Sequence, residues 1–546
     1  MRVLGVNAVF HDPAAALVVD GQIVAAAEEE RFSRRKHGKQ AVPFSTWELP
    51  TQSAKWCLQQ AGITAADLDA VGYSYDPALA APPTGPVDGQ DRDWEYLRTL
   101  YARRAPQFLA TALPGLDPGI VRHVRHHVAH AASASLASPQ PDSAVLVVDG
   151  RGETTSMLAG EYREGKLDIL AAQHLPHSLG LLYESLTEHL GFRRSSDEYK
   201  VMAMASYGRP VLAERLRELV YFCGDGTFRT EPVNWTEFTP PRDPRETGLD
   251  PAHADLACSV QRVLEEVLLD LVLWLHRRTS SGTLCLAGGV ALNCVANTRL
   301  YRDSDFADIW VQPASGDAGT ALGAALAVAA EHNEPLAPMP SASLGRGWSD
   351  DELAAILDAA DVHYQRPADI AVAVADALAA DEVVGWFHGR AEYGPRALGN
   401  RSLLADPRHA GNVERLNNIK GREQFRPVAP MVLAECAAEI FSGGPIPSPY
   451  MLFVHDVADR WRPRIPAVTH VDGTARIQTV DTGNPVLHRM IDNFAARTGV
   501  PVVVNTSFNT AGRPMVDSPH DALECFGAAP IDVLAMGPYL IRRHHQ

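Results

Sequence analysis

The chain has 546 residues, of which 46% are hydrophobic, and a formal net charge of −17 at pH 7. Its length exceeds what one hydrophobic core usually serves, which predicts two domains. The negative charge argues against a nucleic-acid or membrane-surface partner, because both are polyanions that the net field of the protein would repel. An anionic substrate would therefore need a local cluster of basic side chains.

The seven cysteines are scattered and never spaced as CxxC, which favours a reducing compartment over a disulfide-stapled fold. The first residues, MRVLGVN, predict a buried strand and not a signal peptide, because no apolar run follows a basic start. The most apolar helical stretch, 263–275, contains Glu265, Glu266 and Asp270, which would be costly in hydrocarbon. We therefore expect a cytoplasmic protein.

Residues 2–30 predict three strands joined by tight turns, and residues 143–172 repeat this scheme. A strand over 283–289 leads through Gly288 and Gly289 into a helix, a turn that lets a nucleotide approach the backbone. A strand over 307–313 leads into an alanine-rich helix, and no Walker GxxxxGK[ST] motif occurs. These features predict a duplicated actin-like α/β fold, with an ordinary α/β fold as the alternative.

A stretch rich in proline, serine and glycine over 335–347 is the clearest linker signal and predicts a domain boundary near 345. Beyond it we expect a helix over 349–360, strands at 383–387 and 501–505, and a helix that begins at Ser518-Pro519. The second domain is thus also predicted to be mixed α/β. Two proline-rich stretches, 76–96 and 238–252, could shape an acceptor pocket, although surface loops are the commoner case.

His126 and His130 are four residues apart, so on a helix their imidazoles share one face and can hold one divalent ion. Asp149 and Asp317 follow predicted strands, and a duplicated fold would bring both carboxylates into the same cleft. Two histidines and two carboxylates suit Fe(II), Mn(II) or Zn(II). Ordinary surface or core histidines are the alternative. Peptidase chemistry is disfavoured because His127 occupies the glutamate position of the HExxH motif.

Eight basic and four acidic residues lie between Gly389 and Pro427, which gives this segment a charge of +4. Arginine suits bidentate binding of phosphate or carboxylate oxygens, and the glycines leave room near the backbone. We therefore expect a pocket for a small phosphorylated anion, with a solvated basic surface as the alternative. The polar residues that end the strand at 501–505 could bind the same anion or a nucleotide, or form a simple turn: Asn505, Thr506, Ser507 and Asn509.

His11 lies in the first acidic turn, beside Asp12, where the first meander should face the cleft. A histidine there could accept the proton of an attacking hydroxyl group. Capping a turn is an equally good interpretation of His11.

Several segments carry a family resemblance that spans nearly the whole chain. They are AAAEEERFSRRKH (25–37), VRHHVAHAASA (124–134), VVDGRGE (147–153), DEYKVMAMASYG (197–208), LAGGVALNCVAN (286–297), GRAEYGPRALGNRSLLADPR (389–408), FRPVAP (425–430), THVDGTARIQTV (469–480) and NTSFNTAGRPMV (505–516). Together they resemble the O-carbamoyltransferases that modify natural products, a family that includes nodulation-factor, aminoglycoside and cephem carbamoyltransferases.

The resemblance implies a duplicated actin-like (ribonuclease H-like) ATPase domain over 1–345, followed by a YrdC-like mixed α/β domain over 346–546. In such enzymes the second domain converts ATP and carbamoyl phosphate into carbamoyl adenylate, and the first passes the carbamoyl group to an alcohol. The expected function is carbamoylation of a small hydroxylated natural product in antibiotic biosynthesis. No nucleic-acid or membrane partner is expected, and a homodimer is compatible with the resemblance. The alternatives are a tRNA-modifying carbamoyl-transfer enzyme and a non-catalytic actin-like ATP-binding module.

The resemblance also assigns roles to matching residues. The expected metal ligands are His126, His130, Asp149 and Asp317, with Fe²⁺ as the metal, Mn²⁺ or Zn²⁺ as alternatives, and Mg²⁺ accompanying ATP. The expected carbamoyl-phosphate contacts are Arg396, Arg401, Lys420, Arg426, Arg476 and Asn505, and the expected catalytic residues are His11, Arg396 and Arg401. The expected nucleotide contacts are Gly150, Lys200, Gly288, Gly289 and Asn293. One departure from the family pattern is AMAS at 203–206, where relatives more often have a GLA-type run.

Overall fold

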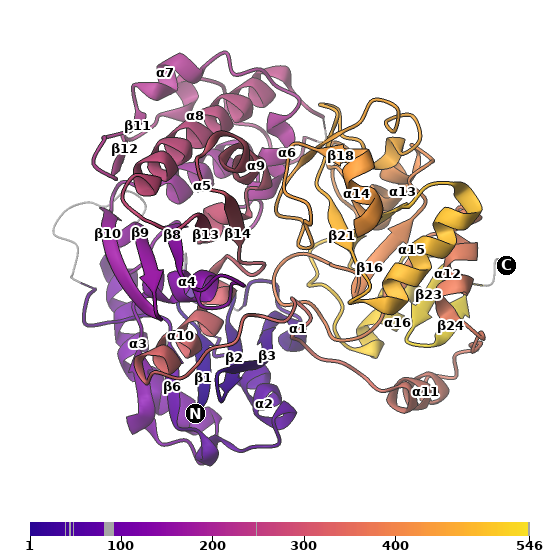
Figure 1. Cartoon of the computed structure of the whole chain (residues 1–546), viewed down its shortest axis with the longest axis horizontal. Helices are drawn as coiled ribbons and strands as arrows, with labels where there is room; N and C mark the ends of the chain where they lie inside the picture. The colour runs from indigo at the N-terminus through magenta and orange to yellow at the C-terminus, as the bar shows by residue number, and fades with distance from the viewer. Residues whose placement is uncertain (39, 43–44, 47, 81–91, 247, 544–546) are drawn as a thin grey trace. The chain divides into compact units, whose positions relative to one another are not determined.

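The computed structural model describes residues 1–38, 40–42, 45–46, 48–80, 92–246 and 248–543 (Figure 1). Part of the predicted acceptor stretch at 76–96 lies outside these residues. The chain divides into two units, Met1–Ser341 and Ala342–Gln546, four residues before the predicted boundary. Among the described helices, none has the length and apolarity needed to cross a membrane.

The first unit contains two five-stranded sheets with the same strand order. In each sheet the first three strands form an antiparallel meander, and the last two run parallel to the central strand. This repeated arrangement is the ribonuclease H-like topology of actin-like proteins, so the predicted duplication is confirmed. The first sheet has the order β3 (Gln22–Glu28), β2 (Ala14–Val19), β1 (Arg2–Asn7), β6 (Ala70–Tyr73), β7 (Val121–His123), and the second β10 (Lys166–His174), β9 (Thr155–Arg163), β8 (Ser143–Val148), β13 (Thr283–Ala287), β14 (Asp308–Val311).

Two helices, α4 (His126–Ser135) and α10 (Asp317–Glu331), lie between the sheets (Figure 1). Helix α4 follows the first sheet in sequence but packs on β8, β9 and β13 of the second, whereas α10 follows the second sheet and packs on β1, β2 and β6 of the first. The two helices also pack against each other. Small residues allow this close approach, because a Cβ on Gly323 of α10 would lie 1.7 Å from the carbonyl oxygen of Ala129 on α4.

The remaining elements of the first unit surround this frame. They are α1 (Glu30–Ser33), β4 (Gln40–Val42), β5 (Ser45–Thr46), α2 (Thr51–Gln60), α3 (Arg92–Ala112), α5 (Leu179–His189), α6 (Glu198–Ala205), α7 (Ala213–Arg217), β11 (Val220–Phe222), β12 (Phe228–Thr230), α8 (Pro251–His276) and α9 (Cys294–Asp303). Helix α8 contains the apolar stretch at 263–275. Glu265 and Glu266 of this helix form ion pairs with Arg299 and Arg217, which stabilise charges that would be unfavourable in a membrane.

The second unit is built on one seven-stranded mixed sheet. Its strand order is β21 (Gln478–Val480), β17 (Ala429–Leu433), β22 (Val502–Ser507), β16 (Arg401–Ala405), β15 (Val384–Phe387), β23 (Val533–Met536), β24 (Tyr539–Arg542). A three-stranded sheet contains β18 (Phe441–Ser442), β19 (His455–Val457) and β20 (Thr474–Ala475). The predicted mixed α/β character is confirmed, whereas the likeness to YrdC stays a prediction.

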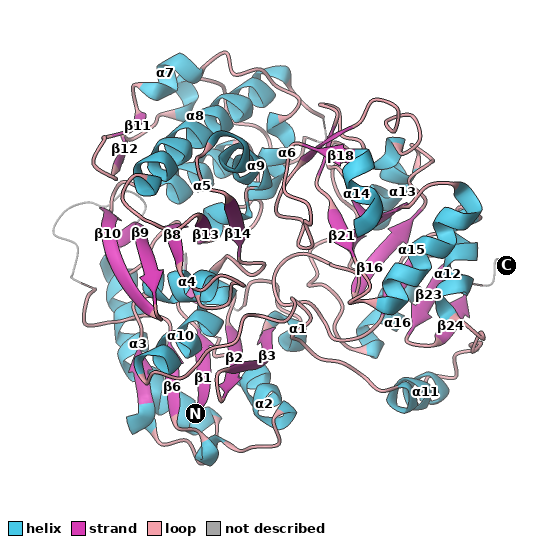
Figure 2. Cartoon of the chain, viewed as in Figure 1, coloured by secondary structure: helices cyan, strands magenta, loops and turns pink. Residues whose placement is uncertain are grey.

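The helices of the second unit include α12 (Ile370–Ala379) and α15 (Pro485–Thr498), which pack against each other (Figure 2). Helix α11 (Asp350–Ala359) begins after Ser349, and α16 (Pro519–Ala528) begins after Ser518. Both serines form capping boxes, which satisfy backbone N–H groups at the helix start, so both predicted starts are confirmed. The other helices are α13 (Asn412–Ile419) and α14 (Ala434–Ile440).

Candidate functional site

The four predicted metal ligands lie together in the first unit, with ligand atoms within 4.8 Å of one another. His126 is the first residue of α4, His130 lies one turn later, Asp317 is the first residue of α10, and Asp149 directly follows β8. His126 Nε2 is 3.5 Å from Asp149 Oδ2 and 3.6 Å from Asp317 Oδ1. His130 Nε2 is 3.8 Å and 3.7 Å from the same two oxygens.

This donor set fits a divalent metal ion. All four side chains are buried, and four of their polar atoms have no hydrogen-bond partner among the described residues: His126 Nε2, His130 Nδ1, His130 Nε2 and Asp317 Oδ2. A buried polar atom without a partner costs about 1–3 kcal/mol, so this cluster is unfavourable unless something binds it. Metal bonds of roughly 2.0–2.1 Å place neighbouring ligand atoms roughly 3.3 Å apart in a tetrahedral site, close to the observed separations.

The electrostatics of the cluster also favour a cation. Burial lowers the pKa of His126, but the negative charge of Asp317 and the interaction with Asp149 outweigh burial and raise this pKa to about 10. Burial, together with the charge of His126, lowers the pKa of the neighbouring His127 to about 3. The two carboxylates thus create a field that attracts positive charge to the point where the four ligands meet.

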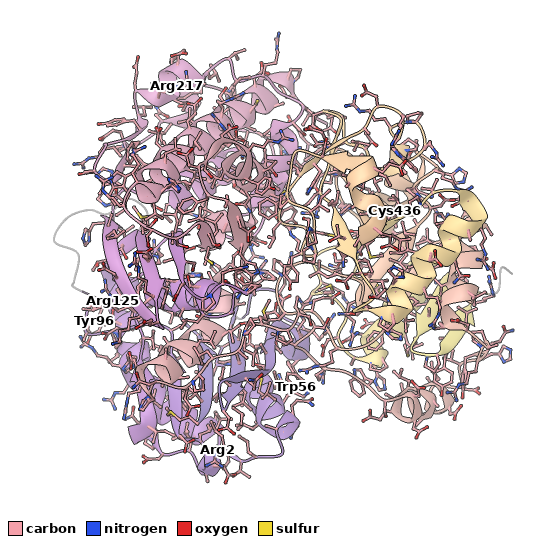
Figure 3. The ribbon with its side chains drawn as sticks, in the orientation of Figure 1. Arg2, Trp56, Tyr96, Arg125, Arg217 and Cys436 are labelled. Carbon is pink, nitrogen blue, oxygen red and sulfur yellow. The ribbon has the colours of Figure 1, made fainter. Side chains whose placement is uncertain are left out.

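Other residues orient the ligands. Arg125, directly before α4, is exposed (Figure 3), whereas His126, the first residue of α4, is fully buried. The helix is therefore buried from its first residue onward. His126 Nδ1 lies 3.1 Å from the carbonyl oxygen of Ser74, and this bond leaves Nε2 for the ion. Glu153 Oε1 accepts a hydrogen bond of 2.8 Å from the backbone N–H of His126. Sequence reasoning missed Glu153, although it follows Asp149 by four residues in the quoted segment VVDGRGE.

His11 lies beside this cluster, with Nε2 3.8 Å from Asp317 Oδ2. Burial lowers its pKa, but the charges of Asp317 and Asp12 outweigh this effect and raise the pKa well above its usual value. Asp12 Oδ2 lies 2.9 Å from His11 Nδ1, and Asp12 Oδ1 lies 2.8 Å from His37 Nδ1. His37 Nε2 in turn contacts the hydroxyl of Ser196 at 3.0 Å. Sequence reasoning named the pair of His11 and Asp12 but missed His37, which is 25 residues away along the chain.

The predicted nucleotide contacts are largely engaged by other protein groups. Gly289 N donates to Asp149 Oδ1 at 2.9 Å, and a Cβ on Gly288 would lie 2.2 Å from the carbonyl oxygen of Val148. The glycine pair therefore allows the turn after β13 to pack against the end of β8. The carbonyl of Gly150 accepts a hydrogen bond from Ser178 Oγ, and Lys200 forms an ion pair with Asp197. The side chain of Asn293 donates a hydrogen bond to Gln261 and also caps the start of α9.

The predicted anion-binding residues all lie in the second unit, and none of the basic ones is exposed: Arg396, Arg401, Lys420, Arg426 and Arg476. Lys420 Nζ donates to Ser507 Oγ at 3.0 Å and to Asn509 Oδ1 at 2.6 Å, beside the end of β22. Asn505 Nδ2 donates to the carbonyl of Ala397 at 3.0 Å, which connects β22 to the loop that contains Arg396. Partial or complete burial of five cations argues against a solvated basic surface, whereas the anion pocket stays a prediction.

Arg401, an expected carbamoyl-phosphate contact, also bonds to the backbone around it. Its Nη1 donates to the carbonyls of His388 and Gly389 at 3.0 and 3.1 Å, and its Nη2 donates to the carbonyl of Arg346 at 2.9 Å. The guanidinium also lies over the ring of Phe387, 3.8 Å from its centroid. Arg401 therefore holds the backbone around the basic loop. Arg426 lies 3.6 Å from Glu423, and Arg476 lies between β20 and β21.

Comparison with known proteins gave consistent matches. Residues 2–77 and 116–326 match a family model described as Carbamoyltransferase N-terminus, and residues 375–543 match Carbamoyltransferase C-terminus. The chain is 38% identical to an uncharacterized protein of Synechocystis sp., covering 100% of this chain and 97% of that protein. It is 38% identical to Nodulation protein NolNO of Sinorhizobium fredii, covering 98% of this chain and 80% of that protein. Nodulation protein NolO of Bradyrhizobium diazoefficiens is 39% identical, with coverages of 77% and 79%.

Solved structures match part of the chain. The structure of HypF from T. kodakarensis has a TM-score of 0.37 at 15% identity and covers 61% of this chain and 48% of that chain. A ROK hexokinase from Thermus thermophilus has a TM-score of 0.29 at 18% identity, with coverages of 60% and 98%.

Proposed function

The chain belongs to the carbamoyltransferase family, and on this premise we propose that it uses ATP and carbamoyl phosphate to carbamoylate a hydroxyl group of a small natural product, as in antibiotic tailoring. Carbamoyl phosphate, ATP, water and the alcohol would yield the carbamate ester, AMP, pyrophosphate and phosphate. The family membership shows a carbamoyl-transferring enzyme. The donor, the nucleotide and the acceptor class are the proposed parts.

The observation that carries the proposal is the cluster of partly or fully buried basic residues in the second unit. Carbamoyl phosphate is a small anion, and its phosphate charge repels a nucleophile until basic groups neutralise it. Asn505 on β22 donates to the carbonyl of Ala397, the neighbour of Arg396 in sequence, and Lys420 donates to Ser507, two residues further along the same strand. A buried site would also protect a carbamoyl adenylate, a mixed anhydride, from water.

In the first unit, His11 is suited to receive the proton of the acceptor hydroxyl when the divalent ion is bound, because the charge of the ion would offset the charge of Asp317 that otherwise raises the pKa of His11 and keeps the ring protonated. The bond between its Nδ1 and Asp12 Oδ2 fixes the ring and supports an imidazolium once the proton has moved. Its Nε2 faces the metal cluster at 3.8 Å from Asp317 Oδ2, so the accepted proton and the reacting oxygen would meet beside that cluster. When bound by His126, His130, Asp149 and Asp317, a divalent ion, with Fe²⁺ expected, would polarise carbonyl and phosphate oxygens as a Lewis acid.

A small hydroxylated molecule is the proposed acceptor, and no nucleic-acid or membrane partner is proposed. The net charge of −17 disfavours tRNA as the acceptor, because a polyanion would meet a repulsive field. The same charge disfavours an anionic membrane surface. We propose a cytoplasmic location, since carbamoyl phosphate and ATP are cytoplasmic metabolites.

The purified protein should be incubated with Fe²⁺, Mg²⁺, ATP and carbamoyl phosphate, with either a panel of hydroxylated metabolites or tRNA as acceptor. We expect pyrophosphate release that depends on carbamoyl phosphate, and AMP formation together with a mass gain of one carbamoyl unit on one small acceptor. Pyrophosphate release that does not require carbamoyl phosphate would overturn the proposed donor. Carbamoylation of tRNA alone would overturn the proposed acceptor class.

Two variants separate the proposed half-reactions. His11→Asn should retain pyrophosphate release but lose transfer, whereas Arg396→Ala should lose both. Arg460→Ala is a matched control, because Arg460 lies in the same unit, is 68% exposed and forms an ion pair with the exposed Glu439. Its activity should equal that of the natural sequence.

A further inference from the structure

The connection between β15 and β16, residues 388–400, is organised by the carboxylate of Glu392. This side chain is 1% exposed. Its Oε1 accepts hydrogen bonds from the backbone N–H groups of Leu398 at 2.7 Å, Asn400 at 2.9 Å and Arg401 at 3.2 Å. One carboxylate oxygen thus collects three N–H groups from the other end of the same loop, which bends the loop into a fixed shape.

The carbonyl groups of this segment are held as well. Asn505 Nδ2 donates to the carbonyl of Ala397 at 3.0 Å, Gln478 Nε2 to that of Leu398 at 2.8 Å, and Trp386 Nε1 to that of Gly399 at 2.8 Å. These three donors come from β22, β21 and β15. The carbonyl groups of the loop are therefore bonded to three strands of the sheet. Its N–H groups are bonded to Glu392, near the start of the same loop.

This arrangement affects how an anion can bind. Three N–H groups that converge on one point would form a good anion site, but here the carboxylate of Glu392 occupies that point. These three N–H groups are therefore engaged by Glu392, and we expect side chains to supply the positive charge for the anion. Arg396 directly precedes the anchored segment, so the direction of its side chain depends on the shape that Glu392 imposes.

We infer that Glu392 is a positioning residue for the anion site: through its bonds to Leu398, Asn400 and Arg401 it fixes the loop from which Arg396 reaches the phosphorylated substrate. The inference rests on the proposed function, because it assigns the substrate of that loop. Removing the carboxylate would leave three buried N–H groups without their acceptor and free the loop to move. Misplacement of a binding group by about 1 Å is enough to change a reaction rate by up to roughly a hundredfold.

Two variants of Glu392 test this inference. Glu392→Ala removes the acceptor, and Glu392→Gln keeps an amide oxygen that can accept the same N–H groups without the charge. The measurements are kcat, the KM for carbamoyl phosphate and the KM for ATP, each from pyrophosphate release, together with thermal unfolding. We expect Glu392→Ala to raise the KM for carbamoyl phosphate about tenfold or more, with a smaller change in the KM for ATP. Glu392→Gln should restore most of the loss. If the alanine variant does not fold, Glu392→Asp replaces it, because its carboxylate is one methylene shorter and cannot reach the same three N–H groups without moving the loop, so the KM for carbamoyl phosphate should still rise.

Asp532→Asn provides a matched control for a purely structural role. Asp532 Oδ2 accepts the backbone N–H of Val383 at 2.7 Å, directly before β15, whereas Glu392 acts beyond the other end of that strand. This control should lower the unfolding temperature but leave the KM for carbamoyl phosphate unchanged. If the Glu392 variants behave in the same way, with unfolding lowered and the KM unchanged, Glu392 has only a structural role and the inference is wrong.

Failure of the proposed function can be recognised separately. If the natural sequence shows no turnover with carbamoyl phosphate, the proposed donor is wrong, and Glu392 is then tested by calorimetric titration with inorganic phosphate. Weaker phosphate binding in Glu392→Ala, restored in Glu392→Gln, supports the positioning role for an anion site of another substrate. Equal phosphate binding in all proteins, or no binding by any, overturns it.

Discussion

Replacing Gly323 by alanine tests whether the metal cluster depends on the close crossing of α4 and α10. An alanine Cβ would lie 1.7 Å from the carbonyl oxygen of Ala129, 2.6 Å from its carbonyl carbon and 2.9 Å from the backbone nitrogen of Ser133. Non-bonded heavy atoms prefer separations of roughly 3.5 Å, so the two helices would have to move apart by roughly 1–2 Å. All three atoms belong to the backbone of α4 and cannot rotate away as a side chain could.

The energetic balance of this substitution has two opposing parts. Alanine is favoured over glycine inside a helix by about 1 kcal/mol. Overpacking of a tight core costs about 1–3 kcal/mol and sometimes more, and a clash with rigid backbone belongs at the upper end. We therefore expect a net destabilisation of about 1–2 kcal/mol.

The displacement would also reach the metal ligands. Ala129 directly precedes His130, and α10 begins with Asp317, so moving the helices apart separates ligands on opposite helices. The ligands of a binding site must lie within about 0.5 Å of the positions that the bound ion requires. We expect metal affinity to fall by about tenfold or more, in the range seen when groups that support a metal ligand are lost.

The assay is titration with Fe²⁺ under anaerobic conditions, read by metal analysis of the protein after desalting, together with thermal unfolding. Gly527→Ala is the control, because Gly527 lies in helix α16 and a Cβ there would meet no atom within 4 Å. The control should bind metal normally and be as stable as the natural sequence or slightly more stable. If Gly323→Ala matched the natural sequence in both measurements, the close crossing would not control the site, and the reasoning would be refuted.

Three further substitutions address separate parts of the protein. Asp317→Asn replaces a buried anionic ligand by a neutral amide, so metal retained after desalting should fall at least about tenfold; full retention would argue against Asp317 as a ligand. Lys420→Met removes a buried cation beside the end of β22 and should raise the KM for carbamoyl phosphate about tenfold, measured by pyrophosphate release, while an unchanged KM would place the anion elsewhere. Burial and the charge of Glu184 raise the pKa of Glu198 to about 7 from 4.5. The folded state therefore keeps a proton that the unfolded chain loses, so stability falls as pH rises from 4.5 to about 7. Glu198→Gln should reduce this fall in urea unfolding between pH 5 and 7.5, and equal slopes for both proteins would contradict the shift.

The duplicated fold could be predicted because the signal lies in local sequence that occurs twice. VLGVN in β1 and SAVLVV in β8 are continuous apolar runs, as expected for central strands buried on both faces. The cluster of metal-ligand candidates could also be anticipated, because a spacing of four residues on a helix and carboxylates at strand ends are local features. The structure brings all four side chains together, as this prediction requires.

The contacts of Arg401 and Glu392 could not be predicted in the same way. Their partners are backbone carbonyl and N–H groups of residues up to 55 positions away, such as the carbonyl of Arg346. Every residue has these groups, so no residue type in the sequence marks them. Their positions depend on the path of the loop at 388–400, which the sequence indicates only as glycine-rich. The hydrogen bond that adds His37 to the pair of His11 and Asp12 was missed for a related reason. His37 is 25 residues from Asp12 in sequence and comes close to it only in the folded structure.

The duplication explains why the metal cluster and His11 lie at the same place. Each repeat ends in a helix that crosses onto the other repeat, so the first residues of α4 and α10, His126 and Asp317, come together. The two repeats then differ at the end of their central strands. Asp149 directly follows β8 and faces the cluster, whereas Asn7 at the end of β1 donates to the carbonyls of His11 and Asp12, each at 2.9 Å, and holds their turn. The central strand of one repeat therefore leads to a metal ligand, Asp149, and that of the other leads to the turn of the proposed base, His11. Because α4 and α10 supply the other ligands, a change that separates these helices should weaken metal binding and proton transfer together.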